Sequence, residues 1–123
     1  MIRCWLAVAA LGGLFAVAAG AVAAHFTGSE LRAAELLRTG ALYGLVHAAA
    51  LLAVAALADR TERPGLALAI AGSAFAIGIV LFSFSLYALA LIGDARFAWL
   101  TPFGGVSLLI GWAAIALHAW QRR

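Results

Sequence analysis

The chain has 123 residues, of which 67% are hydrophobic and 11% are charged, whereas an average soluble domain is about 45–50% apolar and about 25% charged. Its mean hydropathy is +1.09. A soluble fold of this size buries only about two-thirds of its surface, so this composition excludes an ordinary soluble enzyme, a disordered tail and a disulfide-rich secreted module. The sequence predicts a protein that folds in lipid.

Four uncharged stretches are long enough to cross a bilayer as helices, because about 20 residues span the roughly 30 Å hydrocarbon core. The predicted spans are 4–24, 41–58, 66–92 and 102–120. Their connections are short, which predicts antiparallel neighbours. The expected fold is therefore all-α: one domain, residues 1–123, forming an up-down bundle of four transmembrane helices. An amphipathic helix at 29–38 is expected to lie at the membrane interface before the second span.

The first stretch has an alternative interpretation as a cleaved signal peptide. Arg3, an apolar run and the small residues Ala21-Val22-Ala23 resemble such a peptide and its cleavage site. However, the run is longer than a usual signal core, so we favour a retained first span. The single cysteine, Cys4, is interpreted as a passive small residue, with acylation near the membrane as the alternative.

Several residues mark the expected helix ends. Thr27 and Glu30 have the spacing of a capping box, in which both side chains bind free backbone amides. Pro64 and Pro102 suit the first turn of a helix, where the missing N–H group costs nothing. Gly93 suits a helix C-terminus.

The distribution of basic residues predicts the orientation. All eight basic residues are arginines and form no basic face, so a nucleic-acid partner is not expected. Four spans place five arginines on the side of both termini (Arg3, Arg60, Arg63, Arg122 and Arg123) and three on the other (Arg32, Arg38 and Arg96). The positive-inside rule therefore predicts that both termini are cytoplasmic. Trp5 and Trp120 are assigned to an aromatic belt on that side, and Trp99 to the opposite belt.

Small residues recur every four positions on the first two spans. They are Gly12, Ala16, Gly20 and Ala24, followed by Gly40, Gly44 and Ala48. Such faces let helix backbones approach closely in lipid. We expect them to pack against other helices within the chain, with a self-dimer as the alternative.

Four strings occur in an order that resembles one known family: residues 20–25 (GAVAAH), 39–48 (TGALYGLVHA), 82–87 (FSFSLY) and 101–112 (TPFGGVSLLIGW). Together they cover essentially the whole chain and are similar to the YgdD-like proteins, also called the transmembrane protein 256 family, a domain of unknown function. The chain departs from the family pattern in having Phe84 where a glycine is usual, Gly44 where a glutamine is usual, and fewer glycines before His25. The resemblance implies a multi-pass protein of the bacterial inner membrane with four helices, and it implies no reaction.

Polar residues of two predicted spans lie at matching depths. At 1.5 Å per residue, Tyr43 and His47 are about 6 and 12 Å below one membrane surface, and Tyr87 and Ser83 about 9 and 15 Å. Polar side chains in hydrocarbon need partners within the protein. We therefore expect Tyr43 and His47 to face Ser83 and Tyr87 in the non-cytoplasmic half, in a candidate polar cluster that includes Ser85.

His47 is the ionisable residue deepest in a span, which makes it a candidate functional residue. The favoured interpretation is a neutral imidazole that donates a hydrogen bond to a Ser, Tyr or backbone carbonyl. The alternatives are a ligand or proton site, or a metal or haem ligand. His25 is expected near the interface, too far away to share an ion, and no deep carboxylate completes a metal set. Ser83 and Ser85 lack the third group that a serine nucleophile and its base require.

The start of the fourth span contains a helix-entry motif, Thr101, Pro102, Gly104 and Gly105. The two glycines suit close packing against the first or second span, with anion binding at the helix N-terminus as the alternative. Trp112 lies near the predicted midplane, where its indole N–H needs a partner.

Two functional hypotheses follow. The first is a non-catalytic structural or accessory membrane component, whose partners are the lipid bilayer and a larger membrane protein complex or further copies of the chain. The second is binding or transport of a small polar ligand, a lipid headgroup or a proton through the candidate polar cluster. We expect no enzymatic activity, no catalytic residue, no metal and no cofactor.

Overall fold

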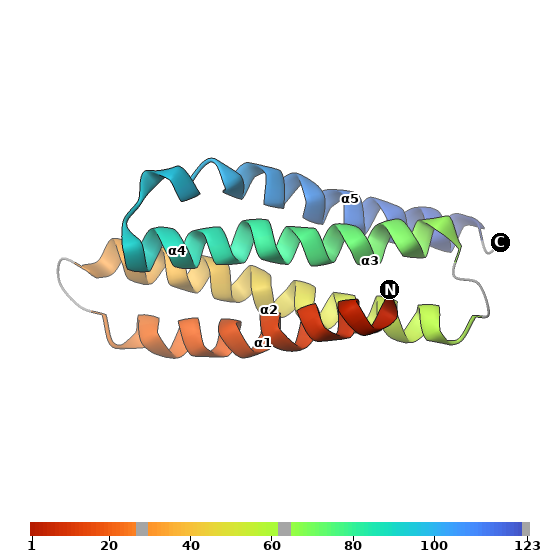
Figure 1. The fold of residues 1–123 in the computed structure, drawn as a ribbon, viewed down its shortest axis with the longest axis horizontal. Coiled ribbons are helices and arrows are strands. Elements are labelled where there is room, and N and C mark those ends of the chain that lie inside the picture. Colours follow the sequence, from red (N-terminus) through yellow and green to blue (C-terminus); the bar gives the residue numbers. More distant parts are fainter. Residues whose placement is uncertain (27–29, 62–64, 122–123) are drawn as a thin grey trace.

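The computed structural model describes residues 1–26, 30–61 and 65–121, and within these residues every regular element is a helix. The elements are α1 (Ile2–Ala24), α2 (Leu31–Asp59), α3 (Leu66–Gly78), the π-helix η2 (Ile79–Phe84), α4 (Ser85–Ile92), the 3-10 helix η3 (Ala95–Phe97) and α5 (Leu100–Gln121). α3, η2 and α4 follow one another as a single rod (Figure 1). In the described chain, four helices are long and apolar enough to cross a membrane. The predicted all-helical bundle with four membrane-length helices is confirmed.

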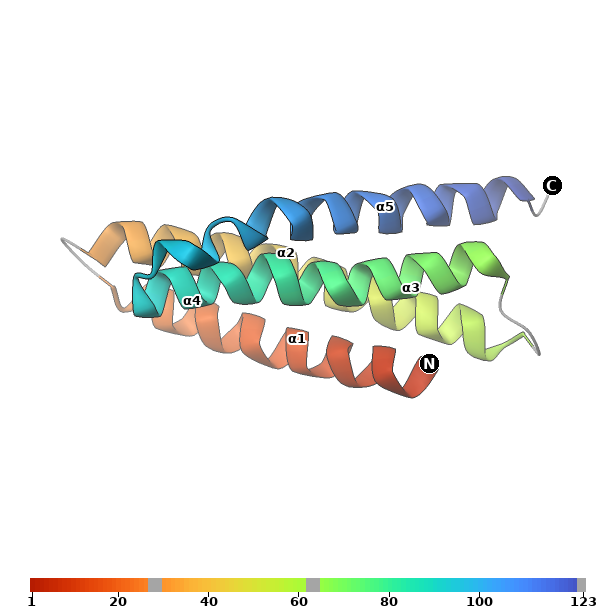
Figure 2. The same cartoon turned by 45° about the horizontal axis from the view of Figure 1, so that its top comes forward.

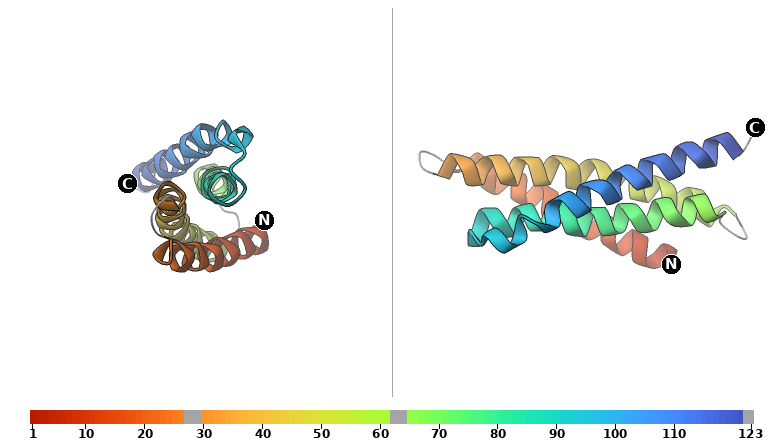
Figure 3. Two further views of the ribbon diagram at one scale, coloured as in Figure 1. Left: turned by 90° about the vertical axis from the view of Figure 1, so that its left-hand side faces the viewer. Right: turned by 90° about the horizontal axis from the view of Figure 1, so that it is seen from above.

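The helices run alternately up and down, and both termini lie at the same end of the bundle (Figure 1). α1 packs along α2, and α5 packs along α3 and η2. In the turned view the rod lies between α1 and α5 (Figure 2), and seen end-on both α2 and the rod lie between them (Figure 3). The rod and α2 are therefore the elements that can bring polar residues into the bundle interior.

Small residues hold α1 against α2. A β-carbon added to Gly44 would lie 3.5 Å from Cβ of Ala16, and one added to Gly12 would lie 3.7 Å from Cβ of Ala48. These are ordinary contact distances between helices whose backbones have come close together. The prediction that the small-residue faces pack within the chain is confirmed.

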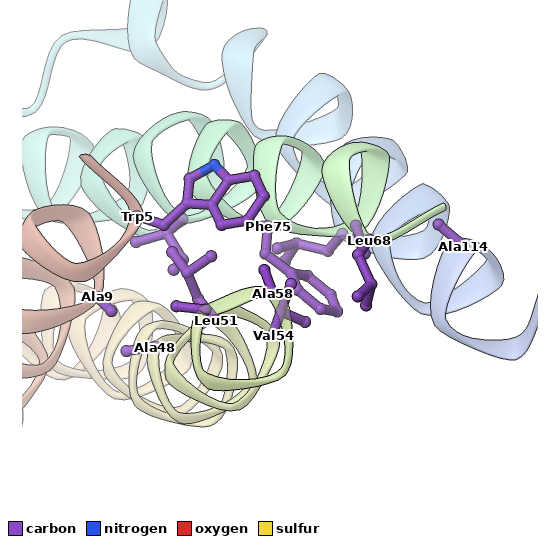
Figure 4. Packing of buried hydrophobic residues seen from close by; sticks show 13 residues of the cluster. Trp5, Ala9, Ala48, Leu51, Val54, Ala58, Leu68, Phe75 and Ala114 are labelled. Atoms are coloured by element: carbon purple, nitrogen blue, oxygen red, sulfur yellow. The ribbon is translucent and has the colours of Figure 1, made fainter. Parts of the chain in front are cut away.

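The largest buried cluster lies toward the end of the bundle that holds the termini, where Leu51 and Val54 of α2 meet Phe75 of α3 (Figure 4). Trp5 belongs to this cluster and is 4% exposed. Its assignment to an aromatic belt was wrong, because Gly72 leaves room for the indole ring against α3. Trp99 and Trp120 are exposed on the bundle surface.

The helix ends agree with the sequence where they are described. Gly93 ends α4 with a φ of 74°, in the left-handed region, and Pro102 lies in the first turn of α5. Arg38 donates a hydrogen bond to the carbonyl of Ala23, in the last turn of α1 (3.3 Å). The expected capping box at Thr27 and the helix start at Pro64 lie outside the described residues.

The expected interfacial helix at 29–38 is not a separate element. From Leu31 onward it is the beginning of α2, which continues without a break to Asp59. Ala34 and Leu37 are buried with Ala23 of α1 and with Tyr87. Because its apolar residues have partners within the bundle, this segment continues along the bundle axis as part of α2.

Candidate functional site

The π-helix η2 shapes the middle of the third span. Its hydrogen bonds run between residues five apart instead of four, a geometry that is rare and occurs mostly as single turns in α-helices, often at functional sites. η2 contains Phe82 and Ser83, and Ser85 follows it directly. This element was not predicted, because nothing in an apolar run such as residues 79–84 distinguishes a π-helix from an α-helix.

Ser83 and Tyr87 pack against the glycine face of α2. A β-carbon added to Gly44 would lie 3.1 Å from both Ser83 Oγ and Tyr87 Oη, and one added to Gly40 would lie 2.6 Å from the Tyr87 ring. Ser83 is 2% exposed and Tyr87 is 7% exposed. The Tyr87 hydroxyl is buried beside the Ser83 hydroxyl, but it forms no hydrogen bond of good geometry among the described residues.

His47 uses both ring nitrogens within the bundle. Its Nδ1 lies 2.7 Å from the carbonyl oxygen of Tyr43, one helical turn earlier. The indole Nε1–H of Trp112, on α5, donates to His47 Nε2 at 3.0 Å. A carbonyl only accepts and an indole N–H only donates. The two partners therefore select the neutral imidazole with its hydrogen on Nδ1.

Aromatic rings surround this histidine. Tyr43 stacks on the imidazole with ring centroids 5.9 Å apart. The ring centroid of Phe75, on α3, lies 5.7 Å from that of the imidazole. Tyr43 also contacts Phe82 of η2, with centroids 4.7 Å apart. His47 is 6% exposed, whereas Tyr43 is 43% exposed at the bundle surface. We call His47, Trp112, Tyr43, Phe75 and Phe82 the histidine–aromatic cluster.

The expected cluster of Tyr43, His47, Ser83 and Tyr87 is thus divided into two groups. They occupy one region of the bundle, as the depths predicted, but on two adjoining faces of α2. Ser83 and Tyr87 meet the face that holds Gly40 and Gly44. Tyr43 and His47 meet Phe75, Phe82 and Trp112 instead. The division arises because the two glycines, which have no side chains, let Tyr87 lie directly against the α2 backbone.

Ser85 has a separate role at the start of α5. Its hydroxyl donates to the carbonyl of Phe82 (2.9 Å) and lies 2.8 Å from Thr101 Oγ1. A hydrogen bond between these two hydroxyls joins α4 to the helix-entry motif. Ser85 of the candidate polar cluster and Thr101 of the helix-entry motif are therefore in contact, although their spacing along the chain did not indicate it.

The glycines of the helix-entry motif serve close packing. A β-carbon on Gly104 would collide with backbone atoms of Leu81 and Phe82, whereas one on Gly105 would lie 3.8 Å from the Phe82 ring. Nearby, Ser107 Oγ donates to the carbonyl of Ala74 at 2.8 Å. The geometry favours the packing interpretation of Gly104 and Gly105 over an anion site. The expected partner was wrong, because both glycines pack against η2 in the third span and not against the first or second span.

A groove runs along the surface between α2 and α5, beside the histidine–aromatic cluster. Its volume is about 390 Å³. Tyr43 and His47 line it from α2, Phe82 lines it from η2, and the segment from Gly105 to Trp112 lines it from α5. We call it the α2–α5 groove. Because its walls are mainly apolar, it suits hydrocarbon better than a hydrated solute.

His25, Asp94 and Arg96 lie at the ends of helices or in the connection between them. His25 is exposed and forms the C-cap of α1. Asp94 accepts hydrogen bonds from the backbone and side chain of Arg96, at 2.9 Å from the backbone nitrogen. These hydrogen bonds hold the pKa of the Asp94 carboxyl below its usual value. Across the described ranges, no group of three His, Cys, Asp or Glu residues is placed to hold a metal ion.

Comparison with known proteins gives a consistent result. The family model described as "Protein of unknown function (DUF423)" matches residues 19–105. A UPF0382 membrane protein of Haemophilus influenzae is 40% identical over 121 residues, which are 97% of this chain and 95% of the relative. The UPF0382 inner membrane protein YgdD of Escherichia coli is 39% identical over 119 residues, 95% of this chain and 89% of the relative.

Relatives with lower sequence identity give the same result. The UPF0382 membrane protein YwdK of Bacillus subtilis is 34% identical over 119 residues, which are 95% of this chain and 96% of the relative. No solved structure matches the chain significantly. The names of these relatives state a membrane location and no reaction.

Proposed function

This chain belongs to the DUF423 family of membrane proteins, and from that premise we propose that it is a non-catalytic structural or accessory component of the bacterial inner membrane. It is a multi-pass protein of that membrane. It acts by contact with lipid and with other membrane proteins. A larger membrane complex or further copies of the chain are the partners we propose.

One observation carries this proposal: His47 is fully engaged inside the bundle. Its two ring nitrogens are 2.7 Å from the Tyr43 carbonyl oxygen and 3.0 Å from Trp112 Nε1. A catalytic base or proton carrier needs a free nitrogen within reach of its substrate. Here Nε2 joins α2 to α5 through Trp112, and the Nδ1 contact within α2 holds the ring in place for it, which is a structural use of the residue.

The test is chemical cross-linking in native membranes at native expression level, followed by purification in mild detergent. The proposal expects the chain to co-purify with specific membrane proteins or with further copies of itself. A chain recovered as an uncross-linked monomer in all conditions would contradict it.

The orientation forms part of the same proposal. The structure has both termini at one end of the bundle (Figure 1), and the arginine count supports a cytoplasmic location for that end. A C-terminal fusion to green fluorescent protein, which is fluorescent when folded in the cytoplasm, is expected to be bright. A C-terminal alkaline phosphatase fusion, which is active outside the cytoplasm, is expected to be inactive. The reverse pair of results would overturn the orientation.

A second candidate function is ligand binding, and the α2–α5 groove favours it. Tyr43 offers an exposed phenol at this groove, and His47 and Trp112 form its polar floor. A small ligand with one polar end is the class that these walls suit, because the rest of the surface is apolar. Replacing His47 by Leu separates the two functions: a stable bundle with a lost phenotype favours binding, whereas loss of the folded bundle favours the structural role.

A further inference from the structure

A second groove lies at the end of the bundle that holds both termini, far from the histidine–aromatic cluster. α2 continues beyond the start of α1 (Figure 1), and between the two helices lies a groove of about 720 Å³. We call it the α1–α2 groove. Its volume is within the usual range of about 300–1,000 Å³ for small-molecule sites.

Opposite charges line this groove at its outer end. Arg3, in the first turn of α1, and the N-terminal amine of Met1, its N-cap, are the positive groups, and Asp59, the last residue of α2, is the negative one. The side chains of Arg3 and Asp59 are exposed. Among residues 1–26, 30–61 and 65–121 the ion pair that the structure contains is Asp94 with Arg96. Within that part of the chain, Arg3 and Asp59 therefore share a groove without pairing.

The helix ends reinforce this pattern of charge. Antiparallel packing places the N-terminal end of α1, which carries partial positive charge, beside the C-terminal end of α2, which carries partial negative charge. Arg3 adds to the first and Asp59 to the second. The groove therefore offers separate positive and negative positions in one small space.

The deeper wall of the groove is apolar. Leu6 of α1 is 43% exposed and Leu52 of α2 is 46% exposed, and Ala56 is an exposed small residue between Leu52 and the end of the helix. These side chains lead from the charged end toward the hydrocarbon-facing surface of the bundle. A molecule that fits must be charged at one end and apolar along the rest.

We propose that the α1–α2 groove binds a phospholipid with a zwitterionic, ammonium-bearing headgroup. The phosphate lies at Arg3, the ammonium lies at Asp59, and an acyl chain follows Leu6, Leu52 and Ala56. An anionic phospholipid fits less well, because its headgroup offers Asp59 no positive charge. This inference goes beyond the structural role proposed above and does not depend on it.

The test uses the purified full chain in nanodiscs that contain equal amounts of phosphatidylethanolamine and phosphatidylglycerol. The lipid retained after release into the gas phase is counted by native mass spectrometry. We expect the wild-type chain to retain phosphatidylethanolamine in preference to phosphatidylglycerol. Equal retention, or preference for phosphatidylglycerol, would overturn the proposal.

Charge variants identify the headgroup contacts. Arg3→Gln is expected to lower the amount of bound phospholipid about tenfold, the effect of losing one charge-assisted hydrogen bond. Asp59→Asn is expected to reverse the preference toward phosphatidylglycerol. The matched controls are Arg32→Gln and Glu35→Gln, which remove the same charges from exposed positions at the other end of α2. Equal effects of test and control variants would contradict the site.

A steric variant tests the groove with both charges in place. Ala56→Trp fills the apolar wall and is expected to remove the bound lipid. Ala113→Trp, at an exposed position on α5 that does not line the groove, is the control and is expected to leave binding unchanged. All three test positions are exposed, so the thermal unfolding of each variant should match that of the wild-type chain. Unchanged binding in Ala56→Trp would contradict the predicted position of the acyl chain.

Discussion

The two sides of α5 contact the rest of the bundle in different ways. On one side, Gly104 lies against the backbone of η2, and Gly111 receives the ring of Phe75. On the other side, Trp112 reaches α2 through one hydrogen bond to His47, beside a groove of about 390 Å³. One side is closely packed and the other is bridged by side chains.

The comparison shows two solutions to one problem. In lipid there is no hydrophobic force between helices, so they associate through close packing and through hydrogen bonds between side chains. Close packing depends on many contacts and tolerates no added atoms. A polar bridge contributes little free energy but fixes how one helix is rotated relative to the other. We therefore expect the two sides of α5 to respond very differently to substitution.

The largest effect is expected at Gly104. In Gly104→Ala the new methyl group would collide with the backbone at Leu81 and Phe82, and two helices must move apart to accept it. We expect a loss of about 3 kcal/mol in the free energy of unfolding, as for severe overpacking. The measurement is reversible unfolding in mixed micelles, followed by circular dichroism.

The neighbouring glycine supplies the control for this prediction. In Gly105→Ala the methyl group would lie 3.8 Å from the Phe82 ring, an ordinary contact distance. Alanine is also a better helix former than glycine by up to about 1 kcal/mol. Gly105→Ala is therefore expected to be neutral or stabilising. Similar losses in both variants would show that backbone contact is not what distinguishes the packed side of α5.

A smaller effect of opposite sign is expected at Tyr87. Its hydroxyl is buried in the closely packed region against Gly44, without a hydrogen-bond partner among the described residues. Burying an unsatisfied polar group costs about 1–3 kcal/mol. Tyr87→Phe is therefore expected to raise the free energy of unfolding by about 1 kcal/mol in the same assay. A destabilised Tyr87→Phe would show that the hydroxyl has a partner that the packing depends on.

Tyr43→Phe is the matched control for this substitution. Tyr43 is 43% exposed, and its contacts with His47 and Phe82 are made by the ring. Removing its hydroxyl is expected to leave stability nearly unchanged. A stabilisation as large as that of Tyr87→Phe would attribute the effect to reduced polarity in general and not to the unsatisfied group.

The sequence predicted the helices and the region of the polar residues, because both are properties of position along one axis. Apolar length determines a span, and rise per residue determines depth. These arguments locate His47 and Ser83 in the same region of the bundle. They also required a partner for the Trp112 indole, and the structure supplies one.

The rotation of each helix about its own axis was beyond sequence reasoning. The π-helix η2 changes the direction in which Ser83 and every later side chain of the third span point, compared with the direction that an uninterrupted α-helix would give them. Gly40 and Gly44 were expected to pack within the chain, but their spacing did not indicate that Tyr87 of the third span is the side chain they receive. The contact between Gly104 and η2 sets the rotation of α5 and so determines that Trp112 faces α2. No local sequence pattern specifies that contact.

The smallest effect is expected for the bridge itself, and a double-mutant cycle measures it. Trp112→Phe removes the donor and keeps an aromatic ring against Phe75. In the wild-type chain the ring centroids of Phe75 and Trp112 are 5.2 Å apart. His47→Leu removes the acceptor together with the contact to the Tyr43 carbonyl. We expect a coupling free energy of about 0.6 kcal/mol, the average for such hydrogen bonds in membrane proteins, with about 1.7 as the upper bound.

The sign of the individual changes tests the contrast between the two sides of α5. Trp112→Phe alone leaves His47 Nε2 buried without a donor, so it should be destabilising. In the presence of His47→Leu the same substitution should cost less, because no acceptor then remains unsatisfied. A coupling of several kcal/mol would mean that the polar bridge, and not close packing at Gly104, is the main attachment of α5. A coupling of zero would mean that the aromatic contacts alone fix its rotation.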